Sequence, residues 1–286
     1  MSEDDTALRQ RRRASQRVLR RRRRLLLGGL ALAVLAGLAA AALAYRHFHN
    51  PAPPPPEPRP RTITLTIPEG YNRQQTAELA REAGLKGSYM KASRGHEGFL
   101  FPDTFELEKG APASDLVKRQ LEDFKQRIAG VSMAYARSKN LTTRDVVTIA
   151  SMIEREAGLA AQRRLVAAVI YNRLHEGIPL GIDATVRFAT GNYERPLTES
   201  ELAVDSPYNT RVNPGLPPGP IDSPGLASIE AAAHPARVGY LYYVTEPGAC
   251  GKLSFSTTAA EFEADVARYN EARAAAGGNS PDSCEE

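Results

Sequence analysis

The side chain best suited to chemistry in this sequence is Glu156, a carboxylic acid on the apolar face of a predicted helix. On a period of 3.6 residues, it shares that face with the residues three, four and seven positions before it. These are Ile153, Met152 and Ile149. Burial raises the pKa of a carboxyl group, which lets it hold a proton near neutral pH and donate it. Spacing alone equally allows the alternative that this side chain reaches water at the helix end, beside Gly158.

A second acid, Glu154, lies two positions earlier on the same predicted helix. The residues three and four positions before it are Ser151 and Ala150, so it does not share the apolar face. We expect Glu154 either to support the site and its substrate or to be exposed.

The positive charge of the chain is concentrated at its amino-terminal end. The whole chain has a formal net charge of +4; residues 1–24 contribute +7, which leaves −3 for residues 25–286. Because residues 25–286 are weakly acidic, they do not indicate a surface that binds polyanions. The sequence therefore predicts no nucleic-acid partner. It also predicts no metal or other cofactor, because five scattered His and two Cys have no metal-ligand spacing.

An uncharged run of twenty residues, 25–44, has the length that a helix needs to cross a bilayer. Ten arginines precede it, whereas Arg46 alone follows within the next ten residues. The positive-inside rule therefore predicts a membrane anchor with a cytoplasmic amino terminus and everything after Tyr45 outside. A cleaved signal peptide is the alternative, because Ala42-Leu43-Ala44 has the form of a cleavage site.

Beyond this run, the proline-rich stretch 51–61 predicts an extended polyproline II spacer. Periodicity and end signals then predict strands and helices along the remaining chain. The expected strands are 62–67, 240–245 and 253–257, and the expected helices are 73–83, 114–138, 143–157, 161–175, 226–233 and 258–275. Residues 183–224 lack regular periodicity and are rich in Pro and Gly. A long irregular segment of this kind more often forms the wall of a binding site than a plain loop between two elements.

The two cysteines, Cys250 and Cys284, both lie on the oxidising side in this topology. A disulfide that pins the carboxyl-terminal tail and a pair of unpaired thiols are both compatible with the sequence.

Seven segments occur in a characteristic order: Gly98–Phe105, Ile149–Glu156, Ala168–Leu174, Tyr208–Thr210, Gly215–Ile221, Ser223–Gly225 and Ser228–Ala232. This ordered set resembles the endolytic murein transglycosylases, the MltG or YceG-like family. With its flanking elements it covers roughly residues 62–272. Each segment is weak evidence alone, but seven in the same order with similar gaps are very specific.

The resemblance implies a single-pass enzyme, anchored in the inner (plasma) membrane, that cuts peptidoglycan strands internally, between N-acetylmuramic acid and N-acetylglucosamine. Glu156 matches the second acid of the family's E-x-E pair, which implies that it is the catalytic residue. It would protonate the glycosidic oxygen and then, as carboxylate, take the proton of the sugar's own 6-hydroxyl while that oxygen closes onto the anomeric carbon. The product carries a 1,6-anhydro end.

Three further residues in matching segments are implied as substrate-binding candidates, since a developing oxocarbenium ion favours electron-rich neighbours. They are Tyr208, Asn209 and Asp183. The alternative is structural, with Asn209 forming a turn and Asp183 capping a helix. Family members often have Pro in place of Ala184 and His in place of Leu253; these departures do not affect Glu156.

The fold expected is α+β, with a single transmembrane helix, a small LysM-like unit and a mostly helical catalytic domain with a small antiparallel sheet. The divisions are a basic cytoplasmic tail (1–24), a transmembrane helix (25–45), a proline-rich linker (46–61), the LysM-like unit (62–97), the transglycosylase catalytic domain (98–275) and a tail (276–286). Family members often have a second LysM-like segment, which is missing here. The resemblance also implies glycan strands as substrate and association with peptidoglycan synthases.

A non-catalytic peptidoglycan-binding scaffold is the alternative function. The enzyme is favoured, because a scaffold gains nothing from an acid on an apolar helix face. A serine-dependent peptidase is disfavoured, since neither Ser151 nor Ser206 lies in a nucleophile elbow.

Overall fold

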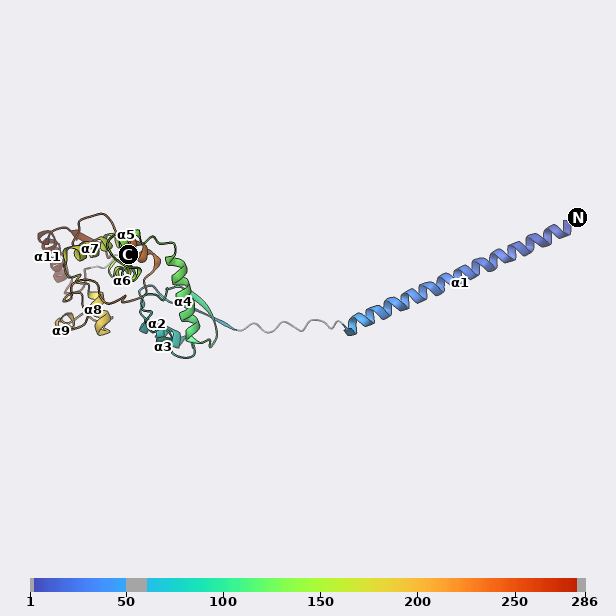
Figure 1. Ribbon diagram of the computed structural model, residues 1–286, viewed down its shortest axis with the longest axis horizontal. Helices are drawn as coiled ribbons and strands as arrows, with labels where there is room; N and C mark the ends of the chain where they lie inside the picture. Colours follow the sequence, from blue (N-terminus) through green and yellow to red (C-terminus); the bar gives the residue numbers. More distant parts are fainter. Residues whose placement is uncertain (1–2, 50–60, 282–286) are drawn as a thin grey trace. The chain divides into compact units, whose positions relative to one another are not determined.

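The computed structural model describes residues 3–49 and 61–281, which belong to two compact units (Figure 1). The first unit contains the helix α1, Glu3–His49. Its segment Arg21–His49 is long and apolar enough to cross a membrane, and the expected span 25–45 lies within it. A helix of this kind near the amino terminus is consistent with either an anchor or a signal sequence. The spacer expected over 51–61 lies outside the described residues except for Arg61.

The second unit is mostly helical with two small antiparallel sheets, which confirms this part of the expected fold (Figure 1). Its strands are β1 (Thr62–Thr66), β2 (Thr104–Glu108), β3 (Tyr242–Thr245) and β4 (Leu253–Ser256). Its helices are α2 (Arg73–Glu82), α3 (Tyr89–Ala92), α4 (Ala113–Ile128), α5 (Ala134–Ser138), α6 (Thr143–Glu156), the 3₁₀ turn η1 (Ala160–Gln162), α7 (Arg163–Glu176), α8 (Asp183–Thr190), α9 (Glu199–Leu202), α10 (Leu226–Ala233) and α11 (Ala259–Ala275).

Helix α6 lies at the centre of the larger hydrophobic core. It begins with a capping box, in which the Thr142 hydroxyl accepts from the backbone N–H of Asp145 and the Asp145 carboxylate accepts from Thr142. Every residue from Val146 to Ile153 is buried, and α7, α8 and α10 pack around the helix. The helix ends at Glu156, so its last turn emerges directly from this core.

A second hydrophobic core lies between the β1–β2 sheet, α2 and the first half of α4. The two strands pair antiparallel, with Thr62 opposite Glu108. This core extends from Leu65 to Val117 and therefore runs past residue 97, where the sequence placed the end of the LysM-like unit. That functional division stays a prediction.

The two cores meet where the turn after β1 contacts the segment before α10. The backbone N–H of Gly70 donates to the Ser223 carbonyl at 3.0 Å, and the Ser223 N–H donates to the Tyr71 carbonyl at 3.0 Å. Nearby, Gly98 has a φ of +81°, and a Cβ atom at this position would lie 2.3 Å from Cβ of Pro220. Both the backbone conformation and the close contact require glycine here.

Several secondary-structure predictions are confirmed by the structure. The expected hairpin forms, with Tyr242 opposite Ser256, and α10 spans the predicted residues. Helix α7 ends at Gly177, whose φ of +69° is the left-handed conformation that terminates helices. The pairing of Cys250 with Cys284 lies partly outside the described residues; Cys250 itself is not a free thiol.

Two predictions were wrong, and one strand was missed. The single helix expected over 114–138 is two helices, α4 and α5, because the chain leaves helical geometry around Gly130, a residue with low helix propensity. The segment 183–224 is not wholly irregular: α8 buries an apolar face and α9 begins with a Thr198–Glu201 capping box. Strand β2 was missed, although its residues alternate between exposed and buried as a half-buried strand requires.

We predict that Gly98→Ala lowers the free energy of unfolding by about 3 kcal/mol, because it adds a clash with the rigid Pro220 ring to the strain of a left-handed residue. Gly84→Ala is the matched control: Gly84 has a φ of +75°, but no atom lies within 4 Å of the place that its Cβ would take, so only about 1 kcal/mol of strain is expected. Urea unfolding of both variants measures the difference, and equal losses would contradict the packing argument.

Candidate active site

Glu156 lines a pocket of about 390 Å³ at the carboxyl-terminal end of α6. The other lining residues come from five separate stretches of chain, and they are Arg173, Leu180, Gly181, Asp183, Arg211, Tyr243 and Phe262. The Glu156 side chain is partly buried, so it is held by protein on most sides and open to the pocket on the remainder. A carboxyl group in this position can contact a ligand while being shielded from bulk water.

Tyr243 is the direct partner of the Glu156 carboxyl group. Its phenolic O–H donates to Oε2 of Glu156 at 2.9 Å. The tyrosine lies on β3, and the β3–β4 hairpin brings it to the end of α6. This hydrogen bond fixes one of the two carboxyl oxygens of Glu156.

Burial is the main influence on the ionisation of Glu156, and it raises the pKa of the carboxyl group because the charged form is poorly solvated. The negative charge of Asp183 raises this pKa further. The hydrogen bond from Tyr243, one from the backbone of Ala184 and the charge of Arg155 act in the opposite direction. The net shift is upward, so Glu156 holds its proton at a higher pH than an ordinary glutamic acid.

Arg173 supplies a fixed positive charge at the pocket. Its Nε donates to the Leu241 carbonyl at 2.6 Å, and its Nη1 donates to the carbonyls of Leu180 at 2.8 Å and Pro179 at 3.2 Å. Its guanidinium also stacks over the ring of Tyr242, 5.1 Å from the centroid. Partial burial lowers the pKa of Arg173.

Asp183 lies in the same pocket as Glu156. It is the first residue of α8 rather than its cap, which is Ile182. Its carboxylate pairs with Arg211 at 2.6 Å, and its side chain is 53% exposed, so it remains accessible from the pocket. Asp183 therefore presents a solvated carboxylate beside the shielded one of Glu156.

Glu154 is directed away from this pocket and toward the junction of the two cores. Its Oε2 accepts from the backbone N–H of Gly225 at 3.0 Å, and its Oε1 lies 3.8 Å from a guanidinium nitrogen of Arg163. The side chain is only 8% exposed. These contacts give Glu154 a role in holding α6 against the segment before α10.

Tyr208 and Asn209 do not line the pocket either. The Tyr208 ring packs against Phe188, with centroids 4.8 Å apart. Asn209 is fully buried, and its amide nitrogen donates to the carbonyls of Leu202 at 3.0 Å and Val204 at 2.9 Å. Its side-chain oxygen accepts from the Arg211 backbone N–H at 3.0 Å, so Asn209 shapes the loop that delivers Arg211 to Asp183.

Sequence reasoning missed Tyr243, Arg173 and Arg211 as pocket residues. Tyr243 is 87 residues from its partner Glu156. The alternating pattern around it predicted a strand, but such a pattern does not indicate which helix the strand contacts. Among residues 3–49 and 61–281, no group of three or more His, Cys, Asp and Glu side chains could hold a metal ion.

This chain is similar to proteins that are named endolytic murein transglycosylases. It is 34% identical over 174 residues to the endolytic murein transglycosylase of Bacillus subtilis, an alignment that covers 60% of this chain and 48% of that protein. It is 32% identical over 180 residues to the endolytic murein transglycosylase of Streptococcus pneumoniae R6, covering 60% of this chain and 32% of that protein. The chain thus matches about half, or less, of the length of these relatives.

A crystal structure of a YceG-like protein from Listeria monocytogenes has a similar fold. The TM-score is 0.64 at 30% sequence identity, and the match covers 70% of this chain and 75% of that one. The model of the YceG-like family matches residues 41–268, which include α6, the pocket and the β3–β4 hairpin. The chain therefore belongs to the YceG-like family.

Proposed function

We propose that this chain is an endolytic peptidoglycan transglycosylase in which Glu156 acts first as acid and then as base. The observation that carries this proposal is a carboxyl group with a raised pKa, held by Tyr243 at the wall of an open pocket. The naming of relatives as endolytic murein transglycosylases supports the substrate class.

In the proposed reaction, protonated Glu156 donates its proton to the oxygen that joins N-acetylmuramic acid to N-acetylglucosamine. The bond from this oxygen to the anomeric carbon of the muramic acid breaks, and the N-acetylglucosamine end leaves with a new hydroxyl group. The ionised Glu156 then accepts the proton of the 6-hydroxyl on the same muramic acid, whose oxygen bonds to the anomeric carbon. Holding the nucleophile within the substrate favours ring closure over attack by water.

The neighbouring charges have distinct roles in this proposal. The Asp183 carboxylate stabilises the positive charge that develops on the sugar ring, because it lies in the same pocket as Glu156 and attracts a nearby cation. Arg211 holds the Asp183 side chain in place through their ion pair. Arg173, held by three backbone carbonyls, positions the β3 strand that carries Tyr243.

The proposal includes the location of the reaction. Residues 25–45 of α1 would anchor the chain in the inner (plasma) membrane with residues 1–24 in the cytoplasm, as their excess of arginine favours. The soluble part would then face the peptidoglycan, where the unit that begins at residue 62 acts as a LysM-like glycan-binding element. Peptidoglycan synthases remain the partners that we propose for this arrangement.

A hydrolytic muramidase is the second candidate, because Asp183 gives the pocket a second carboxylate. When two carboxyl groups flank one glycosidic bond, one can act as the general acid and the other as the base that activates water. The two reactions differ in their products: hydrolysis leaves a reducing end, whereas transglycosylation leaves a 1,6-anhydro end.

We predict that Glu156→Gln reduces release of glycan fragments by about 10²- to 10⁴-fold, the usual contribution of a general acid or base. The amide matches the carboxyl in size and still accepts the hydrogen bond from Tyr243, so folding should be unchanged. Digestion of purified peptidoglycan by the full chain, with mass spectrometry of the released ends, measures both rate and product.

Glu154→Gln is the matched control, because it makes the same substitution on the same helix outside the pocket. It should release fragments at the rate of the parent, with anhydro ends. Reducing ends from the parent would identify a muramidase instead. A Glu156→Gln variant that retained full cleavage would rule out the proposed role of this residue.

We predict that Tyr243→Phe shifts the alkaline limb of the pH profile of kcat/KM to higher pH. The phenol stabilises ionised Glu156, so its removal raises the pKa of Glu156 above its value in the parent. Since the reaction begins with protonated Glu156, the variant stays in the active protonation state to a higher pH. Rates measured across the pH range with peptidoglycan as substrate test this direction.

Tyr242→Phe is the control for the pH profile, since Tyr242 is adjacent on β3 but stacks on Phe262 instead of contacting Glu156. Its alkaline limb should coincide with that of the parent. A shift of the Tyr243→Phe limb toward lower pH would show that the phenol favours the protonated form of Glu156.

A further inference from the structure

A second polar cleft, of about 460 Å³, lies outside the Glu156 pocket. One wall is the amino-terminal half of α2, where Asn72, Gln74, Gln75 and Glu78 line the cleft. The other wall is the segment 190–195, which follows α8. The cleft therefore lies between the small unit that begins at β1 and the larger helical core.

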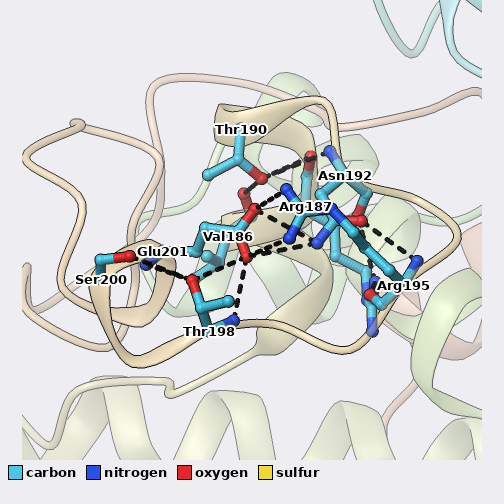
Figure 2. Close-up of polar contacts among 8 residues, drawn as sticks. All are labelled: Val186, Arg187, Thr190, Asn192, Arg195, Thr198, Ser200 and Glu201. Atoms are coloured by element: carbon cyan, nitrogen blue, oxygen red, sulfur yellow. Dashed lines mark hydrogen bonds and ion pairs between the residues drawn. The ribbon is translucent and has the colours of Figure 1, made fainter.

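The wall formed by residues 190–195 is held rigidly by the polar contacts drawn in Figure 2. Arg187 donates to the carbonyls of Asn192 at 3.0 Å and Arg195 at 2.9 Å. The Glu201 carboxylate accepts from the Asn192 amide at 3.2 Å and from Arg195 at 2.9 Å. Because this loop is already held at both ends, ordering it on ligand binding costs little conformational entropy.

The opposite wall is also preformed and is joined to the first. Asn72 caps α2 through a capping box with Gln75. The Asn72 amide nitrogen also donates to the hydroxyl of Tyr193 at 2.7 Å, which connects the two walls across the cleft. Hydrogen bonds within each wall and between the two walls therefore define the cleft.

The chemistry of the lining suits a neutral ligand rich in hydroxyl groups. Gln74, Glu78 and Glu194 are exposed side chains of the lining, and their amide and carboxylate groups can donate to or accept from hydroxyl and amide groups. The arginine of the lining, Arg195, is already paired with Glu201, so the cleft offers little attraction for an anion. Sugars with hydroxyl and N-acetyl groups match this set.

Helix α8 links this cleft to the Glu156 pocket. Asp183, at its amino-terminal end, lines the pocket, and Thr190, at its carboxyl-terminal end, lines the cleft. With a rise of 1.5 Å per residue, the two ends lie about 10 Å apart. An enzyme that cuts inside a strand must accommodate sugars beyond the cleaved bond, and this cleft lies within reach of them.

We propose that the cleft between α2 and residues 190–195 is a second binding site for the glycan strand, which it holds through the hydroxyl and N-acetyl groups of sugars away from the cleaved bond. This inference rests on the proposed function, because it adds a contact to the same substrate. It assigns to Gln74 and Glu194 the binding of sugar rather than any part in bond cleavage.

The test measures strand binding without cleavage. Full-length chain carrying Glu156→Gln is titrated with glycan strands from which the stem peptides have been removed, and binding is followed by fluorescence anisotropy. Adding Gln74→Ala and Glu194→Ala, one from each wall, should weaken binding about tenfold, as expected for the loss of two hydrogen bonds. Adding Glu82→Ala instead should leave binding unchanged, because Glu82 is an exposed acid of α2 outside the cleft.

Equal binding by the double variant and the Glu82→Ala control would overturn the proposal, as would a loss seen only with strands that still carry stem peptides.

Cleavage by the same chains with Glu156 restored separates this proposal from the proposed function. If Glu156→Gln abolishes cleavage while the cleft substitutions leave binding intact, the cleft proposal alone fails. If the cleft substitutions weaken binding while Glu156→Gln still cleaves, the cleft proposal holds and the proposed function fails.

Discussion

The burial of a carboxyl group at the end of α6 is the constraint on which the rest of the site depends. Removing Glu156 from water disfavours its charged form, and the structure limits this cost with a hydrogen bond from Tyr243 and one from the backbone of Ala184. The result is a carboxyl group that ionises less readily than that of an ordinary glutamic acid. A residue that must release a proton and later take one up needs this balance.

The effect of Tyr243 on the ionisation of Glu156 depends on how η1 and α7 hold the β3–β4 hairpin in place. Two hydrogen bonds join the Gln162 side chain to the backbone of Leu253, and the Asn172 amide donates to the carbonyls of Val238 at 2.9 Å and Tyr240 at 2.8 Å. Because these bonds involve backbone atoms, they fix the path of the hairpin independently of its surface side chains. Tyr243 therefore reaches Glu156 from a rigid support, although the two residues are far apart in the chain.

The sequence was sufficient to predict features that depend on neighbours along the chain. The position of Glu156 followed from periodicity, and α6 and α11 carry capping signals within a few residues of their ends. The partners of Glu156 could not be predicted, because contact between α6 and β3 is decided by packing across the whole core. For the same reason, the sequence could not distinguish Asp183, which lines the pocket, from Asn209, whose amide is used by backbone carbonyls.

The short bridge between Gly70 and Ser223 also determines how independent the two cores are. Gly70 and Asp222 line the same small cavity. Asp222 is 1% exposed, has no hydrogen-bond partner for either carboxyl oxygen among the described residues, and has a pKa raised by burial. A chain shortened to begin at residue 98 would lose Gly70 and Asn72 and would therefore open this cavity beside Asp222. The small unit is thus not a detachable module, and its exchange between related proteins would require matching changes in the residues that it covers.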